Sequence, residues 1–147
     1  MRVLLQRVTD AHVKVDGVVV GAIEKGLLLY VGFKEGDLPD MIMPHAEKAV
    51  NLRIFPDENE KMNHSVREFG GDLLVISQFT LYGDVKTGRR PSFTQAMKPD
   101  LANEYYEKFC LACKTCYPEG KVERGKFGAM MQISSINQGP INFLIEL

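Results

Sequence analysis

The sequence contains no tryptophan and only three histidines in its 147 residues. No apolar run approaches the roughly 20 residues that a membrane-spanning helix needs. The first residues become polar and charged too soon to supply the apolar segment of a signal peptide. Neither a P-loop nor a G-x-G-x-x-G motif is present. We therefore expect a cytoplasmic protein without a membrane segment or a glycine-rich nucleotide-binding loop.

Cysteine is also scarce, and its spacing is ambiguous. Cys110, Cys113 and Cys116 resemble part of an iron–sulfur ligand run, but the fourth cysteine is missing. On a helix, the same spacing places them on one stripe beside Tyr106 and Phe109. Reduced cysteine behaves as a small buried hydrophobe, so packing is the favoured interpretation. Because no complete ligand set appears, we expect neither a metal nor a cofactor.

The histidines offer little support for nucleophilic catalysis. A serine or cysteine nucleophile needs a base, which histidine usually supplies. His12, His45 and His64 lie in no recognisable catalytic motif. We interpret them as structural residues and keep a histidine-based triad as the minor alternative.

Composition and charge indicate an ordinary globular domain. Hydrophobic residues make up 45% of the chain and charged residues 25%, and the length suits one domain over residues 1–147. The net charge of −1 gives no global signature of nucleic-acid binding. Residues 84–98 nevertheless carry four bases against one acid, and residues 121–126 carry three against one. Charge alone favours solvated loops there, with phosphate contact as the alternative.

Hydrophobic patterning predicts strands that alternate with two helices. Asp16-Gly17 between β-branched runs predicts a hairpin turn. A helix is expected between Asp37 and Leu52, regular from about Pro44, and a second one over Pro99 to Cys116. The expected strands cover 2–9, 11–15, 18–23, 27–32, 53–55, 130–135, 141–147 and a central stretch that starts near 73. The order implies an α/β fold with a mixed sheet and helices on one side.

The central stretch begins as a buried apolar strand and then turns polar. We expect this strand to begin after Gly70-Gly71 and to stop at Gly83-Asp84. Its second half places Ser77, Gln78 and Thr80 where a core strand would carry hydrocarbon. Burying such groups without partners is costly, so this strand end is a candidate site.

Several motifs together resemble the D-aminoacyl-tRNA deacylase family, also called D-tyrosyl-tRNA deacylases, over essentially the whole chain. They are Gln6-Arg7-Val8, Asn63 in Lys61-Met62-Asn63, Ser77-Gln78-Phe79-Thr80-Leu81, Arg90-Pro91-Ser92-Phe93, Gly125-Lys126-Phe127 and Asn137-Gln138-Gly139-Pro140. The family usually continues the last motif with Val-Thr, whereas this chain has Ile141-Asn142. The resemblance implies a single-domain, three-layer α/β/β fold.

The resemblance also implies an activity. The family hydrolyses the ester that joins a D-amino acid to the terminal ribose of tRNA, and it removes glycine wrongly attached to alanine tRNA. The implied enzyme is a homodimer in which Gly139–Pro140, joined by a cis bond, enters the partner's active site. There its carbonyls would capture the substrate α-amino group and leave no room for an L side chain. Asn137 and Ile141 would contribute to substrate binding, and Arg7 would hold the turn in place.

The remaining implied roles concern the reaction itself. Ser77, Gln78, Phe79 and Thr80 would form the catalytic strand, with Gln78 orienting Arg7 or the ester. Backbone N–H groups of Phe79 and Thr80 would stabilise the oxyanion. We favour water activated by the tRNA 2′-hydroxyl over Thr80 as the nucleophile. The acceptor-stem phosphates would be bound by Lys86, Arg89, Arg90 and Lys126.

Two rival functions remain open from the sequence. One is a noncatalytic RNA-binding module that uses the same basic loops. The other is a hydrolase of a small free ester or amide, with Ser77 or Thr80 as its nucleophile.

Overall fold

The computed structural model describes residues 1–147 and is organised around β1 (Arg2–Val15), which pairs antiparallel with three strands. They are β2 (Val18–Ile23), β3 (Gly26–Gly32) and β8 (Met131–Ile145). Beyond β3, the sheet continues through β6 (Asp72–Ser77) and β7 (Val122–Arg124), both in parallel pairing. The strand order is β2-β1-β3-β6-β7, with β8 on the other edge of β1. The predicted mixed sheet is thus confirmed.

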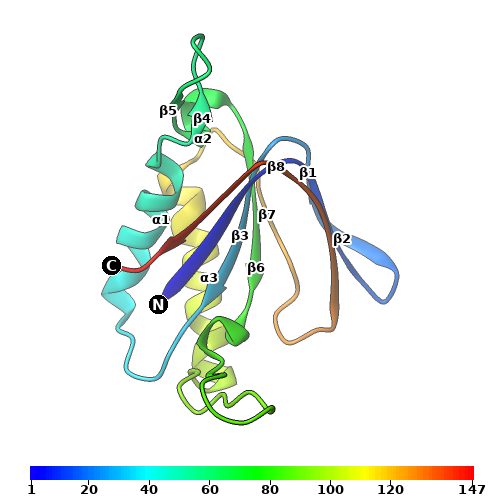
Figure 1. The fold of residues 1–147 in the computed structure, drawn as a ribbon, viewed down its shortest axis with the longest axis vertical. Helices are drawn as coiled ribbons and strands as arrows, with labels where there is room; N and C mark the ends of the chain where they lie inside the picture. The colour runs from blue at the N-terminus through cyan, green and yellow to red at the C-terminus, as the bar shows by residue number, and fades with distance from the viewer.

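The helices lie on one side of this sheet (Figure 1). A 3₁₀ turn, Pro39–Met41, leads into α1 (Ile42–Asn51), and α3 (Pro99–Cys116) lies beside α1. The prediction for α3 is confirmed at both ends. The helix α1 begins two residues earlier than predicted, because Pro44 falls within its first turn, where the missing N–H costs no intrahelical bond.

Two apolar cores give the fold its three layers. The larger core packs α1 and α3 against one face of β1, β3 and β6, and it includes Leu29, Val75, Tyr106 and two of the cysteines, Cys110 and Cys113. The smaller core lies on the opposite face, where the second half of β1 packs over β3 and β6. The sheet therefore curls over itself, as the right-hand side of Figure 1 shows. The cysteines pack as small hydrophobes, as predicted.

Several strand predictions are wrong in their boundaries. The strands predicted over 2–9 and 11–15 form one continuous β1, and the strand predicted over 53–55 is found at Phe55–Pro56. The central strand ends at Ser77, and the next residues form a 3₁₀ turn, Phe79–Tyr82, closed by Gly83 N–H donating to the Thr80 carbonyl at 2.9 Å. The two strands predicted near the C-terminus form one continuous β8. The reason is that β1 offers pairing partners on both sides of the Gly139–Pro140 turn.

Three short elements were not predicted from the sequence. They are β5 (Met62–His64), which pairs with β4 (Phe55–Pro56), the single-turn helix α2 (Val66–Phe69), and β7. Only α2 carries a clear local signal, since the Ser65 side chain and Glu68 form a capping box. The β4–β5 hairpin projects from one end of the molecule (Figure 1).

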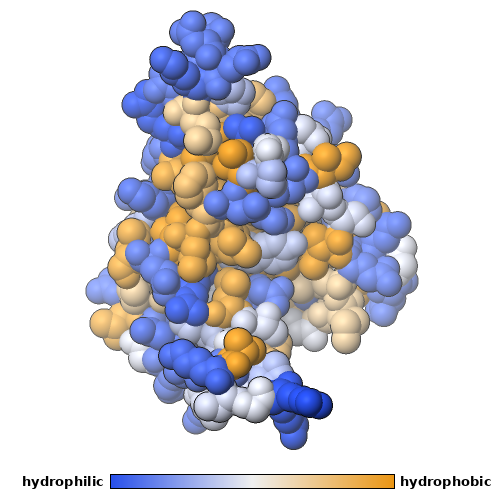
Figure 2. All heavy atoms as spheres, viewed as in Figure 1, coloured by the Kyte–Doolittle hydropathy of each residue, from blue (hydrophilic) through white to orange (hydrophobic).

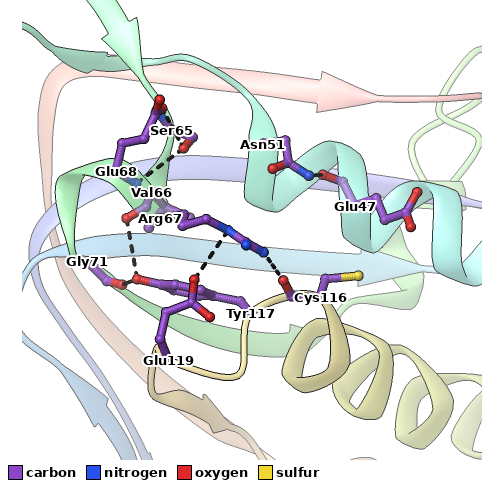
Figure 3. A network of polar contacts seen from close by, with 10 residues as sticks. All are labelled: Glu47, Asn51, Ser65, Val66, Arg67, Glu68, Gly71, Cys116, Tyr117 and Glu119. Atoms are coloured by element: carbon purple, nitrogen blue, oxygen red, sulfur yellow. Dashed lines mark hydrogen bonds and ion pairs between the residues drawn. The ribbon is translucent and has the colours of Figure 1, made fainter.

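A polar network fixes the beginning of β6 (Figure 3). The buried Tyr117 hydroxyl donates to the carbonyl of Gly71 at 2.8 Å, directly before the strand. The side chain of Arg67 on α2 donates to the carbonyl of Cys116 and pairs with Glu119. These contacts connect α2 to the end of α3, so that β6 enters the sheet at a defined position.

Candidate functional site

A pocket of about 740 Å³ opens at the carboxyl ends of the parallel strands β3 and β6. Such strand ends are common ligand sites in α/β sheets. Twelve of its 18 lining residues are hydrophobic. They come from the ends of β3 and β6, the turn after β6, the start of α3 with the segment before it, and the start of β8 with the segment that leads into it. The lining includes Val31, Phe33, Ser77, Gln78, Phe79, Phe93, Met97, Ala102, Phe127 and Met130.

Close backbone packing shapes the floor of this pocket. Gln78 N–H donates to the Val31 carbonyl at 2.7 Å, which ends the β3–β6 ladder. A Cβ atom at Gly32 would lie 2.7 Å from the Gln78 carbonyl oxygen. Only glycine allows this approach, and the chain then turns away at Phe79.

Two aromatic side chains stand at the mouth of the pocket. Phe79 and Phe93 meet edge to face with ring centroids 5.0 Å apart. They are 57% and 40% exposed, which is unusual for phenylalanine. Exposed rings next to an apolar cavity offer a surface on which a planar group can stack.

The turn after β6 supplies free hydrogen-bond donors. The N–H groups of Phe79 and Thr80 make no hydrogen bond within the chain, as expected at the start of a 3₁₀ turn. Arg2 stabilises this turn. Its guanidinium donates to the Leu81 carbonyl at 2.7 Å and lies 4.6 Å from the centre of the Tyr82 ring. Burial raises the pKa of Tyr82, so its hydroxyl stays protonated.

The four predicted catalytic residues are adjacent, but they do not form a triad. Ser77, Gln78 and Phe79 line the pocket, whereas Thr80 does not. The Gln78 amide donates to the Thr80 hydroxyl. Neither Ser77 nor Thr80 is hydrogen-bonded to a carboxylate or an imidazole, so neither hydroxyl has a base to accept its proton.

The predicted substrate-binding residues lie elsewhere: Arg7 is on β1, and the other four lie at or beside a projection of β8. Pairing runs from Val8–Asn137 to Gln6–Asn142, so one residue of β1 opposes four residues of β8. The surplus chain, Gln138 to Ile141, must bulge from the sheet. Its Gly139–Pro140 bond is cis, and both residues are exposed.

Asn137 closes the base of this projection. Its side-chain amide donates to the carbonyl of Arg7 at 3.0 Å and to that of Ile141 at 3.3 Å. The Arg7 guanidinium donates to the Ile54 carbonyl at 2.7 Å, and its buried Nε has no partner. Within one chain, Arg7 therefore contacts the turn segment through its carbonyl rather than through its charge.

The projection and the pocket lie at opposite ends of the sheet. In the strand register, Arg7 of β1 lies level with Leu73 of β6, with β3 between them. Ser77 lies four residues further along β6. With about 3.3 Å per residue and about 4.8 Å per strand over three strand spacings, the separation is roughly 20 Å. One chain does not bring the two predicted halves of the site together.

The strand that carries the projection is unpaired along its outer edge. β8 pairs only with β1. Its exposed apolar side chains include Ile136, Phe143 and Leu144. Figure 2 shows apolar atoms gathered across the middle of the face on which β8 runs in Figure 1, between hydrophilic ends. Long apolar strand edges of this kind are typical of surfaces that pair with another chain.

The four predicted tRNA-binding residues are all exposed. Lys86, Arg89 and Arg90 lie in the segment between Tyr82 and Phe93, and Lys126 directly precedes Phe127 of the pocket. None of the four forms an ion pair. Both segments therefore place uncompensated positive charge near the pocket.

The structure contains no group of three or more histidine, cysteine or acidic side chains that could hold a metal ion. None of its helices is both long and apolar enough to cross a membrane. Sequence reasoning did not assign Phe93, Met97, Phe127 and Met130 to the site. Phe93 and Phe127 belong to two of the recognised motifs, so a signal for them was present, whereas the two methionines had none.

Comparison with known proteins gives a consistent result. Residues 4–146 match the family model described as D-Tyr-tRNA(Tyr) deacylase. A D-aminoacyl-tRNA deacylase of Thermosipho africanus is 50% identical over 99% of this chain and 97% of its own length. One from Exiguobacterium sibiricum is 49% identical over 99% of both chains.

Solved structures show the same fold. One described as a c-Myc DNA unwinding element binding protein has a TM-score of 0.94 and 34% identity, covering 100% of this chain and 99% of its own. A probable eukaryotic D-amino acid tRNA deacylase has a TM-score of 0.84 at 20% identity, covering 99% and 98%. The second likeness shows the fold alone.

Proposed function

We propose that this chain, which belongs to the D-aminoacyl-tRNA deacylase family, carries out its hydrolysis in the pocket at the ends of β3 and β6. As a member of that family it is a carboxylic ester hydrolase that acts on D-aminoacyl-tRNA. We place the reaction there because the N–H groups of Phe79 and Thr80 are free at the edge of an apolar pocket.

The pocket suits the terminal nucleoside of the tRNA. An adenine ring can stack on aromatic side chains without sequence-specific contacts, and Phe79 and Phe93 offer such rings at the mouth. This position brings the ribose ester next to the turn after β6. The free N–H groups then donate to the oxygen that becomes negative as the ester carbonyl is attacked, an interaction worth about 3–4 kcal/mol per donor.

Water is the nucleophile in this proposal. The Thr80 hydroxyl accepts a hydrogen bond from Gln78 and has no base beside it. The 2′-hydroxyl of the terminal ribose is adjacent to the ester and assists the attacking water. Thr80 and Gln78 position the substrate, with Ser77 at the pocket wall.

A second copy of the chain completes the site. Gly139 and Pro140 in the Gln138–Ile141 projection are exposed and about 20 Å from the pocket of their own chain, so they reach a pocket only across a dimer. The free apolar edge of β8 supports such an assembly. We propose a homodimer in which Gly139–Pro140 enters the partner's pocket.

This arrangement gives selectivity by exclusion. The Gly139 and Pro140 carbonyls take the α-amino group of the substrate and occupy the space that an L side chain needs. Asn137 and Ile141 hold the projection, with Arg7 as its anchor on β1. A D side chain points away, and glycine has no side chain to reject, so glycine on alanine tRNA is also removed.

The remaining tRNA lies over the basic segments. Lys86, Arg89, Arg90 and Lys126 contact acceptor-stem phosphates, a contribution that is independent of sequence and weakens with salt. Aminoacyl-tRNA is a cytoplasmic substrate, so we place the protein in the cytoplasm.

The test is the release of amino acid from matched D-Tyr-tRNA and L-Tyr-tRNA. We expect rapid loss of the D ester alone. A chain that binds both RNAs and hydrolyses neither would be an RNA-binding module. Hydrolysis of simple esters at a comparable rate without tRNA would instead support the small-ester hydrolase.

A further inference from the structure

Lys98 is the only charged residue among the 18 that line the pocket. We propose that its ammonium group binds the phosphodiester that joins the terminal nucleoside to the rest of the RNA, and so positions the ester. This inference rests on the proposed function. It assigns a specific positioning role to a residue that the motifs did not include.

The backbone at Lys98 is firmly held although the side chain is exposed. Met97, which precedes it, is buried, and its N–H donates to the Phe33 carbonyl at 3.0 Å. The carbonyl of Lys98 accepts the Ala102 N–H of α3 at 2.9 Å. The base of the side chain therefore has a defined place on the pocket wall, and its flexible stem can reach over the mouth.

The positive charge of Lys98 has no partner within the chain. Lys108 further along α3 pairs with Glu104, and Lys121 pairs with Glu123. No acidic group lies within ion-pair distance of Lys98. An anionic ligand at this wall would therefore not have to displace a carboxylate.

The substrate supplies one anion at the required place. In the proposed pose, the terminal base stacks at the mouth and the ribose ester faces the turn after β6. Base and ribose are uncharged, so the nearest negative charge is the phosphodiester on the 5′ side of that ribose. Lysine suits this partner, because its ammonium is a compact point charge with three donors.

The basic side chains near the pocket contact different phosphates because they lie at different positions. Lys98 lines the pocket, whereas Lys126 and Arg90 lie in the flanking segments and do not. Lys98 therefore acts on the phosphate nearest the reacting bond, and the other two act on phosphates further along the stem.

The experiment compares two substrates with and without that phosphate. D-Tyr-tRNA carries it, whereas D-tyrosyl-adenosine ends at the ribose. We expect Lys98→Ala to raise KM for D-Tyr-tRNA about tenfold and to reduce the slope of log KM against log salt by about 0.7. For D-tyrosyl-adenosine, kcat/KM should not change. Lys98→Arg should restore most of the affinity for tRNA, since it keeps the charge.

The matched control is Lys114→Ala, an exposed lysine on the same helix about 24 Å away along its axis. It should leave both substrates unaffected. Equal losses on tRNA and adenosine ester, or an unchanged KM and salt slope for Lys98→Ala, would overturn the inference. Wild-type protein that hydrolyses neither ester would instead contradict the proposed function. Thermal unfolding of each variant shows whether the fold is intact.

Discussion

The side-chain amide of Gln78 donates a hydrogen bond to the hydroxyl of Thr80, two residues further along the chain. A nucleophilic hydroxyl must instead donate its proton to a base. An amide N–H cannot accept that proton. The hydroxyl can still donate its own proton, but no base is hydrogen-bonded to it, so we expect Thr80 to position a ligand rather than to attack it.

Replacing Thr80 tests this assignment directly. We expect Thr80→Ala to keep kcat for D-Tyr-tRNA within about tenfold of wild type, because positioning groups contribute far less than a covalent nucleophile, whose loss costs about 10⁶. Single-turnover hydrolysis is the measurement. Thr80→Ser keeps a hydroxyl at this position and serves as the control. A fall of several orders of magnitude in Thr80→Ala alone would restore Thr80 as the nucleophile.

Mixing two inactive variants tests whether each active site is formed by two chains. Gly139 has φ of +117°, and a Cβ there would lie 2.6 Å from Ile141 Cγ1, so Gly139→Ala should distort the projection. Ala129→Trp should fill the pocket with an indole ring. Each variant alone should have little activity.

When the two variants are unfolded together and refolded, half of the dimers contain one chain of each variant. Each of these mixed dimers has one intact site. About a quarter of the wild-type activity should return. Refolding each variant alone is the control. Two variants that stay inactive after mixing, while native mass spectrometry shows mixed dimers, would place the projection in its own chain's site.

Stability should depend on pH through His45. Its side chain is fully buried, its Nδ1 lies 2.8 Å from the Met41 carbonyl oxygen, and its Nε2 has no partner. Burial lowers the pKa of His45 below its usual 6.5. As the pH is lowered, His45 therefore binds a proton in the unfolded chain before it does so in the folded chain. Stability is full above about pH 6.5 and falls as the pH is lowered, by at most about 1.4 kcal/mol per pH unit.

Urea denaturation between pH 7.5 and 5.5 measures this slope. In His45→Leu the slope should be smaller than in wild type over that range. His64→Gln, on the surface hairpin, provides the comparison and should retain the wild-type slope. An unchanged slope in His45→Leu would mean that other groups take up the proton.

The three thiols should differ in reactivity. Burial raises the pKa of Cys110 to about 11 and that of Cys113 well above its ordinary range. Cys116 is only partly buried, although burial raises its pKa too. Iodoacetamide reacts with thiolates, so at pH 7.5 the native chain should be alkylated slowly and first at Cys116. Mass spectrometry locates the label, and full labelling in denaturant is the control. Rapid labelling of Cys110 would show that α3 opens locally.

The sequence predicted those elements whose signals are local. Proline at the first turn and an apolar stripe define α3, and Asp16-Gly17 with positive φ at both residues defines the β1–β2 hairpin. The end of β6 was missed because Ser77 to Tyr82 alternates like a strand. The strand stops where its partner β3 ends, and the sequence does not reveal that these two strands pair in this register. The strand β7 has only three residues and exists because β6 pairs with it.

The candidate site likewise has one part that the sequence predicted and one part that it did not. The motifs placed Ser77, Gln78 and Phe79 at the pocket, whereas its remaining wall comes from segments far apart in the sequence. The only signal for Lys98 was the positive balance of residues 84–98, because none of the motifs includes it. Its position became informative only when packing placed Phe33 and Phe127 at the same cavity.

The projection on β8 also has a consequence for how the enzyme responds to its own abundance. In the proposed dimer each site needs a pocket from one chain and a projection from the other, so we expect activity to track the amount of dimer rather than the amount of chain. Well below the dissociation constant of the dimer, halving the total protein would cut the rate about fourfold. Under this proposal, dilution alone would lower the hydrolysis rate per chain, without any inhibitor.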